Sequence, residues 1–573
     1  MRRAIIATAA VAALTATALP AQAAPVTHRA SGGATEYVVL YTSPARASAA
    51  RAAVTAAGGK IVKENRDIGL ATVRTSNADF VSDARRSAAV EGVAHNRAVG
   101  HAPKPGRVAP KADAVEKDVT GGQRTAEKGH HGQGRHAEPL AGRQWDLRQM
   151  GVLGKDGRYQ VHADGRGVKV GIIDTGVDGD HPDIRANFDR RDSRNFTTDI
   201  PVDAEGTTVD GPCEHTSCVD PVDEDDNEHG THVASEIASP RNGLGMAGIA
   251  PKATIVNVRA GQDSGYFFLQ PVVDALTYSG RAGLNVVNMS FYVDPWQWNC
   301  ANNPADSAEA RQEQRTIVAA VQRALAFAHD HGVTLISAAG NYASDYTKPI
   351  LDNTSPDFVD VPGEKPYDRT ITPGECLSMP SQGEHVLSIS ATGPSERKSY
   401  FSDFGKGYVA VAAPGGDAYD TADGKADPTS TILAAYPEAL ARAAGVLNPD
   451  GTPNTPSVVR DCKGSTCAYY QYLQGTSMAS PHAVGLAALI ISRYGHHTRQ
   501  GGLALSPSVV KRIMLGTARA KACPPGGTYT YTRYVRQSDG TYQKVVSTAK
   551  CEGGKRDNGF YGHGIIDAKR AVG

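Results

Sequence analysis

The chain has 573 residues and carries 60 basic and 60 acidic side chains, so its formal net charge is zero. This length exceeds that of one ordinary domain and predicts two folded units together with processing segments. A balanced charge creates no field that attracts nucleic acid or an anionic membrane surface, and both are therefore excluded as expected partners.

The N-terminus has the pattern of a secretory signal. Arg2 and Arg3 precede an apolar run over residues 4–19, and small residues frame a cleavage site at residues 21–23. The run is shorter than the roughly 20 apolar residues that a membrane-spanning helix needs, and it consists largely of alanine. We therefore predict a signal peptide over residues 1–23, a secreted extracellular protein, and no membrane association after signal removal.

All eight cysteines lie beyond residue 200, and in an exported chain an even number favours disulfides over a zinc site. Two pairs are separated by only four residues and favour local bridges, which leaves four cysteines for two longer ones. The pairs expected on this basis are Cys213 with Cys218, Cys462 with Cys467, Cys300 with Cys376, and Cys523 with Cys551. Eight cysteines allow on the order of a hundred connectivities, so other pairings stay open.

Residues 24–100 have the pattern of a small α+β unit. Strand patterns at residues 36–42, 61–64, 70–74 and near 93 alternate with helix patterns at 45–57 and 77–89. This βαββαβ order predicts a ferredoxin-like fold. Residues 101–143 are rich in Gly, Pro, Lys, Arg and His, cannot bury a core, and are expected to form an exposed linker in which cleavage occurs.

Residues 144–573 contain short apolar strands that alternate with helices. The expected strands are 168–173, 254–258, 286–289, 333–337, 386–390 and 408–412, and the clearest helices are 270–282 and 314–331. Such runs predict an α/β domain with a parallel sheet flanked by helices. Polar stretches near 192–227, 295–312, 343–375, 416–430 and 447–466 are expected to be surface insertions.

Three short motifs carry the chemistry that we expect of this domain. Asp174-Thr-Gly follows the strand at residues 168–173, His229-Gly-Thr-His opens a helix, and Gly-Thr-Ser477-Met-Ala-Ser-Pro-His begins an apolar helix. Alone, each residue has an ordinary structural role as a turn former, a polar group or a helix cap. Together, in the order Asp, His, Ser, the motifs resemble those of the subtilisin-like serine proteases, the subtilases.

The resemblance extends from Trp145 to the closing pattern around Asp567 and implies a subtilisin-like peptidase domain over residues 144–573. It implies a serine endopeptidase that hydrolyses peptide bonds in proteins and peptides through an acyl-enzyme, without a cofactor for the chemistry. Residues 24–100 would be an inhibitor-type prosegment that blocks its own enzyme until the linker at residues 101–143 is cut. A self-processed, monomeric zymogen is expected.

The same resemblance assigns roles to four residues. Ser477 would attack the peptide carbonyl, His229 would take up and return the proton, and Asp174 would fix the imidazole tautomer. Asn341, in Ser-Ala-Ala-Gly-Asn, would donate a hydrogen bond to the oxyanion. The rival interpretation is a catalytically silent binding protein with this fold, and the presence of all four residues argues against it.

Calcium is expected only as a structural ion. Asp183 and the turn at residues 240–246, with Asn242, lie where many subtilases bind calcium, although Arg241 in that turn opposes a cation. The acidic run at residues 220–228 is a second candidate, for which a solvated loop is the alternative.

One segment departs from the family pattern. Ser290-Phe291-Tyr292 stands where subtilases usually have Ser-x-Gly-Gly beside the substrate. The side-chain preference is therefore open, and so is the choice between broad digestion and processing of particular partners. Trp296 and Trp298 either border this cleft or pack within the insertion.

Overall fold

A computed structural model describes residues 35–96, 115–117, 137–202, 208–357, 365–498 and 501–573. The predicted signal peptide and most of the predicted linker lie outside these residues. Among the helices of the described ranges, none is both long enough and apolar enough to cross a bilayer.

The N-terminal unit has the βαββαβ order expected from the sequence. Its elements are β1 (Thr35–Tyr41), α1 (Ala47–Ala56), β2 (Lys60–Asn65), β3 (Leu70–Thr75), α2 (Phe80–Ala84) and β4 (Val90–His95). The strands pair antiparallel in the order β2-β3-β1-β4. The helix expected at residues 77–89 spans only α2, because turns flank it on both sides.

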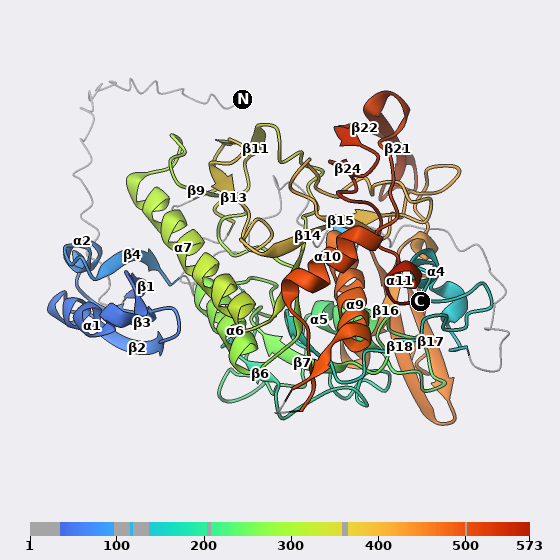
Figure 1. Cartoon of the computed structure of the whole chain (residues 1–573), viewed down its shortest axis with the longest axis horizontal. Helices are drawn as coiled ribbons and strands as arrows, with labels where there is room; N and C mark the ends of the chain where they lie inside the picture. The colour runs from blue at the N-terminus through green and yellow to red at the C-terminus, as the bar shows by residue number, and fades with distance from the viewer. Residues whose placement is uncertain (1–34, 97–114, 118–136, 203–207, 358–364, 499–500) are drawn as a thin grey trace, which may run out of the picture.

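Strand β1 is buried on both faces because its side chains alternate between two cores. Tyr37 and Val39 pack against the helices of the N-terminal unit itself. Val38 and Leu40 instead join the core that contains α6 (Leu269–Arg281) and α7 (Ala308–Asp330) of the larger domain. Figure 1 shows the blue N-terminal unit beside these two helices.

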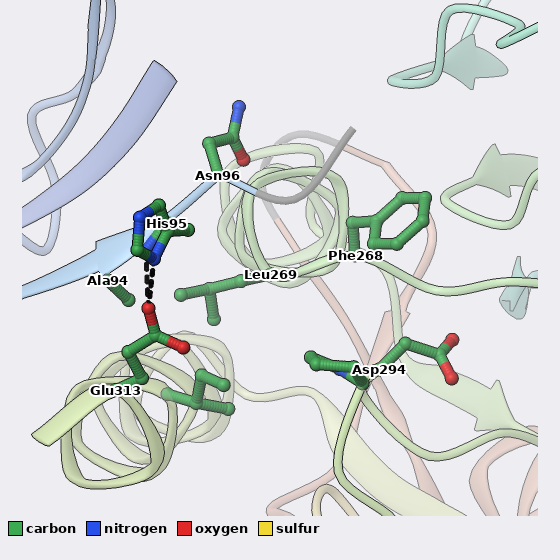
Figure 2. A pocket seen from close by; sticks show the side chains of 9 residues that line it. Ala94, His95, Asn96, Phe268, Leu269, Asp294 and Glu313 are labelled. Atoms are coloured by element: carbon green, nitrogen blue, oxygen red, sulfur yellow. Dashed lines mark hydrogen bonds and ion pairs between the residues drawn. The ribbon is translucent and has the colours of Figure 1, made fainter. Parts of the chain in front are cut away.

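Polar contacts complete this interface. Asn65 donates from Nδ2 to Asp274 Oδ1 at 2.9 Å and to Thr277 Oγ1 at 2.7 Å on α6. At the other edge His95, at the end of β4, points towards Glu313 on α7 and contacts its carboxylate (Figure 2). The cavity beside this pair holds only about 10 Å³, which is the space of one water molecule. The two units are thus closely packed.

The larger domain is built on a seven-stranded parallel sheet. Its strands are β5 (Lys169–Ile173), β6 (Arg194–Asn195), β7 (Thr254–Arg259), β8 (Val286–Met289), β10 (Thr334–Ala338), β14 (Val386–Thr392) and β15 (Val411–Pro414). Their order is β15-β14-β10-β8-β5-β7-β6, and every neighbouring pair is parallel. The predicted parallel sheet is confirmed, and its carboxyl ends meet at one edge.

Helices cover both faces of this sheet. Alternate residues of β5 enter different cores: Val170 and Ile172 pack with α5 (His229–Ala238) and α9 (Thr476–Tyr494), whereas Ile173 packs with α6 and α7. The first turn of α7 lies within the expected insertion at residues 295–312. Ser307 explains this start, since its Oγ accepts a hydrogen bond from the Ala310 N–H at 3.0 Å as a helix cap.

Two β structures were not expected from the sequence. Strands β17 (Val458–Lys463) and β18 (Thr466–Leu473) form a hairpin that pairs with β16 (Ile432–Tyr436), so the supposed insertion at residues 447–466 is partly strand. Strands β21 (Thr528–Arg536) and β22 (Tyr542–Lys550) form a second hairpin.

The remaining elements are short. They are α4 (Trp145–Gln149), α8 (Glu438–Ala443), α10 (Pro507–Thr517) and α11 (Ala568–Val572), the strands β9 (Asn299–Cys300), β11 (Ile350–Asp352), β12 (Arg369–Ile371), β13 (Cys376–Leu377), β19 (His496–His497), β20 (Leu503–Ala504), β23 (Gly553–Gly554) and β24 (Asp557–Asn558), and four 3₁₀ turns, Pro44–Arg46, Ala141–Arg143, Pro428–Ser430 and Pro525–Gly527.

All eight cysteines form disulfides, and the four expected pairs are confirmed. They are Cys213–Cys218, Cys300–Cys376, Cys462–Cys467 and Cys523–Cys551. The last two close the turn of the β17–β18 hairpin and the base of the β21–β22 hairpin. These bridges restrict the unfolded chain and so stabilise the two hairpins.

A buried ion network joins α9 to two other helices. His482 on α9 lies 3.0 Å from Asp146 of α4 and 3.1 Å from Glu236 of α5, and all three side chains are buried. Burial alone would lower the pKa of His482, but hydrogen bonds with Asp146 and Glu236 outweigh it and raise the pKa to about 10. The imidazolium therefore ties α4, α5 and α9 together at neutral pH.

We expect His482→Gln to lower the free energy of unfolding by about 3 kcal/mol, because two buried carboxylates lose their cation. The pKa of His482 is about 10 in the folded protein and about 6.5 in the unfolded chain. The stabilisation is therefore complete below a pH of about 6.5 and is lost as the pH rises towards about 10. Urea unfolding at pH near 6 and near 10, with Ser477 replaced by alanine in both proteins, measures the effect. An equal difference at both pH values would contradict it.

Candidate active site

Asp174 and His229 meet at the carboxyl edge of the sheet. Asp174 follows the last residue of β5 and is fully buried, while His229 is the first residue of α5. The Asp174 carbonyl accepts hydrogen bonds at 3.0 Å from the N–H groups of Ala260 and Gly261, which fixes its backbone against the end of β7. His229 Nδ1 lies 2.7 Å from Asp174 Oδ1. This contact keeps the proton on Nδ1 and leaves Nε2 directed at the neighbouring site.

Asn341 is held in one orientation by the residue before Ser477. Its Oδ1 accepts hydrogen bonds from the Thr476 N–H at 2.8 Å and the Thr476 hydroxyl at 2.9 Å, so its Nδ2 faces the other way. Gly340 makes the turn after β10 with φ +118°, and a Cβ there would lie 2.1 Å from Asp403 Oδ2. Glycine is therefore required at this position.

Ser477 is the second residue of α9, which is buried almost throughout. Its hydroxyl and backbone therefore lie at a helix N-terminus, where unpaired N–H groups favour negative charge. Ser290, directly after β8, donates its hydroxyl to the Ser477 carbonyl at 3.1 Å. The structure thus brings together all four residues that the motifs single out, from β5, α5, β10 and α9.

A fifth residue, Glu116, occupies the centre of this group. Its Oε1 accepts a hydrogen bond from Asn341 Nδ2 at 3.3 Å, and its Oε2 lies 3.6 Å from His229 Nε2. The Ser477 hydroxyl is also hydrogen-bonded to this carboxylate. A negatively charged side chain therefore lies between the Asn341 amide and the His229 imidazole.

The residues on either side of Glu116 are anchored as well. Gln474 donates from Nε2 to the Val115 carbonyl at 2.9 Å and from its backbone N–H to the Glu116 carbonyl at 3.3 Å. Lys117 forms an ion pair with Glu228, next to His229. Three residues of the predicted linker therefore lie across the site.

Glu116 changes the protonation of the site. Burial lowers the pKa of His229, but the carboxylates of Asp174 and Glu116 outweigh it and hold the pKa well above the usual value for histidine. Burial acts to raise the pKa of Glu116, but contacts with His229 and Ser477 have the larger effect. The pKa of Glu116 is therefore lowered below its usual value. An imidazolium cannot accept a proton, so in this arrangement His229 cannot act as a base.

Sequence reasoning did not find Glu116. It is one of five acidic residues between positions 101 and 143, and no motif distinguishes it from the others. Only the tertiary position of residues 115–117 reveals its contacts.

The expected calcium ligands, Asp183 and Asn242, lie together, but the Asp183 carboxylate oxygens already accept hydrogen bonds. Asp183 accepts hydrogen bonds from Asn242 Nδ2 at 2.9 Å, the Met246 N–H at 3.2 Å and the Tyr470 hydroxyl at 3.0 Å. The Lys463 ammonium bonds to the Asn242 carbonyl. Asn242 therefore offers its amide nitrogen, and this donor-rich arrangement does not suit a cation. Calcium at Asp183 and Asn242 stays a prediction.

Aromatic side chains pack against one another in the segment after β8. Phe291 stacks on Phe267 with ring centroids 4.1 Å apart, and the Tyr292 hydroxyl donates to Asp357 at 2.5 Å. Trp296 and Trp298 are buried, which favours the packing role over a position at the border of the cleft.

Comparisons with known proteins identify the family of this chain. A model of the subtilase family matches residues 165–564. Subtilisin DY from Bacillus licheniformis is 27% identical over 354 residues, which span 62% of this chain and 84% of that protein. Thermitase from Thermoactinomyces vulgaris is 26% identical over 332 residues, which span 58% of this chain and 77% of that protein.

Solved structures share the fold. The epidermin leader peptide processing serine protease from Staphylococcus aureus aligns with a TM-score of 0.55 at 19% identity, over 94% of this chain and 98% of that one. Fervidolysin from Fervidobacterium pennivorans aligns with a TM-score of 0.50 at 21% identity, over 94% of this chain and 61% of that one. Since the family model covers well over half of the sequence, this chain belongs to the subtilase family of serine endopeptidases.

Proposed function

We propose that this protein is a secreted endopeptidase, made as a zymogen that cuts its own linker, with Ser477 as nucleophile and His229 as general base. Asp174 orients the imidazole, and Asn341 Nδ2 together with the Ser477 N–H stabilises the oxyanion. The observation that carries this proposal is the arrangement of His229, Asn341 and Ser477 around the Glu116 carboxylate, with Asp174 behind His229 at 2.7 Å.

In the first step the Ser477 hydroxyl attacks the peptide carbonyl while His229 takes up its proton. The imidazolium then protonates the leaving amine, which departs and leaves an acyl-enzyme. Water enters, His229 removes its proton, and the ester is hydrolysed to restore the serine. Acylation and deacylation each begin with a neutral His229 that can accept a proton, and both need an unoccupied oxyanion site.

Glu116 opposes both requirements, and we propose that it keeps the uncut chain inactive. It favours the protonated form of His229 and occupies Asn341 Nδ2. Residues 24–100 would add to this inhibition by packing on α6 and α7, as an inhibitor-type prosegment over the predicted bounds. Export is supported by the signal pattern at residues 1–23 and by the four disulfides.

We expect Glu116→Ala to speed the first cleavage of the secreted precursor by about tenfold or more, because the variant frees the oxyanion site and lowers the pKa of His229. The time course of precursor loss on a gel measures the rate. Glu127→Ala, in the same linker, is the matched control and should leave the rate unchanged. Equal rates for Glu116→Ala and the wild type would contradict the inhibitory role.

An assay on an unfolded protein such as casein tests the proposed activity. We expect casein to be cut by the mature enzyme and left intact when Ser477 is alanine. The stacked Phe291 and Phe267 favour a second candidate, an enzyme restricted to particular proteins. Such an enzyme would leave casein intact while still cutting its own linker.

A further inference from the structure

Glu228 directly precedes His229 and has an unusual backbone conformation. Its φ is +82°, a left-handed value that residues other than glycine rarely adopt. The Glu228 N–H donates to Asp225 Oδ1 at 3.2 Å, and the Glu228 carbonyl accepts a hydrogen bond from the His232 N–H at 3.1 Å. These bonds fix the backbone beside His229 and therefore the point from which the Glu228 side chain extends.

The Glu228 carboxylate is paired with a lysine of the linker. The side chain of Glu228 is 13% exposed, and that of Lys117 is 56% exposed. Within the part of the chain that the structure describes, the contact with Lys117 is the only ion pair of Glu228. The pair thus joins a largely buried acidic residue of the peptidase domain to a cation that does not belong to this domain.

Lys117 reaches Glu228 because the residue before it lies in the catalytic centre. The carboxylate of Glu116 is 3.6 Å from His229 Nε2. Residues 115–117 therefore lie across the site as a short piece of peptide, and Lys117 shows where the next side chain of such a peptide is received. A substrate must displace this piece before it can be cut. Lys117 then leaves Glu228.

The Glu228 carboxylate is less stable as an anion without this lysine. Burial raises the pKa of Glu228, the Lys117 ammonium opposes the rise, and the Asp225 carboxylate adds to it. Departure of the linker removes the favourable contribution and leaves the two unfavourable ones. A new cation at the same place would restore the balance of charge.

Other carboxylates of this domain keep their cations when the linker leaves. A pocket of about 270 Å³ lies between the loop after β5 and the start of α8. Asp180, which lines it, pairs with Arg190 at 2.5 Å. Glu438, also in its lining, pairs with Arg442 at the same distance. Glu228 differs from both because its cation comes from the linker.

We propose that Glu228 selects substrates that carry a lysine or arginine near the cut bond, at the place that Lys117 occupies in the uncut chain. This inference rests on the proposed endopeptidase function. A basic side chain would pair with the carboxylate, whereas a neutral side chain would leave it without a cation. The substrate class is therefore peptides with a basic residue beside the scissile bond.

The test digests a mixture of random peptides with matured wild-type enzyme and identifies the cut bonds by mass spectrometry. Lysine and arginine should be enriched at one position within about three residues of the cut, since Lys117 is adjacent to the residue in the catalytic centre. Paired peptides with lysine or glutamine at that position then give two values of kcat/KM. We expect the lysine peptide to have the higher value by about tenfold or more.

Two variants separate selection of substrates from a structural role. Glu228→Gln removes the charge, and the ratio of the two kcat/KM values should fall to about one or two. Glu228→Lys reverses the charge and should favour glutamate over lysine at the same position. A purely structural residue would lower both values together and leave their ratio unchanged. Glu438→Gln is the matched control and should keep the wild-type ratio, because this carboxylate already pairs with Arg442.

A wild-type enzyme that cuts random peptides without enrichment of basic residues would overturn the inference and leave the proposed function intact. An unchanged ratio in active Glu228→Gln would overturn it as well. So would a ratio that is lost in Glu438→Gln and kept in Glu228→Gln, because the basic side chain would then bind in the other pocket. An enzyme that cuts no peptide would contradict the proposed function and, with it, this inference.

Discussion

Ser477→Ala is expected to abolish removal of the prosegment and to lower peptide hydrolysis by at least about 10⁴-fold. The hydroxyl of Ser477 is the proposed nucleophile, and its loss leaves His229 and Asn341 with nothing to activate or stabilise. The secreted wild-type protein should lose roughly its first 100 to 145 residues, as the position of the linker predicts, while the variant keeps them. N-terminal sequencing and intact mass measure both products.

Ser480→Ala is the matched control for this experiment. Ser480 lies one turn further along α9 and donates its hydroxyl to Asn288 at 2.7 Å, away from Glu116. This variant should still be processed. If wild-type and Ser477→Ala proteins are cut alike, a different protease removes the prosegment, and self-processing is wrong.

Asn341→Ala is expected to lower kcat by about 10²- to 10³-fold, or about 3–4 kcal/mol of transition-state stabilisation. The Nδ2 donor acts on charge that develops only in the transition state, so KM should change little. Its orientation depends on Thr476, which fixes Oδ1 through two hydrogen bonds.

Steady-state kinetics on a chromogenic peptide, with enzyme matured before purification, measures this effect. Asn448→Ala, at an exposed turn, should leave both constants unchanged. An Asn341→Ala enzyme with the wild-type kcat would contradict the oxyanion role.

The central sheet was predictable because its strands are continuous apolar runs. The strand expected at residues 286–289 agrees with β8, and the other expected strands of the sheet overlap those observed, although β15 begins three residues later than expected. The N-terminal unit was predictable for the same reason. Strands β17 and β22 of the two hairpins were missed because they are largely polar and partly exposed, as in Val458–Lys463, so periodicity gave no apolar face.

The residues proposed as the triad were found through their motifs, whereas Glu116 was not. Glu116 acts through its position across the site, which no local pattern encodes.

The most direct test of the central claim is to label the matured enzyme with a fluorophosphonate, which forms a covalent bond with an activated serine hydroxyl. Peptide mapping by mass spectrometry then locates the adduct. We predict a single adduct on Ser477, with loss of peptide hydrolysis in proportion to labelling, and no adduct when His229 is replaced by alanine. An active enzyme that carries no adduct, or carries it on another serine, would contradict the assignment of Ser477 as the nucleophile.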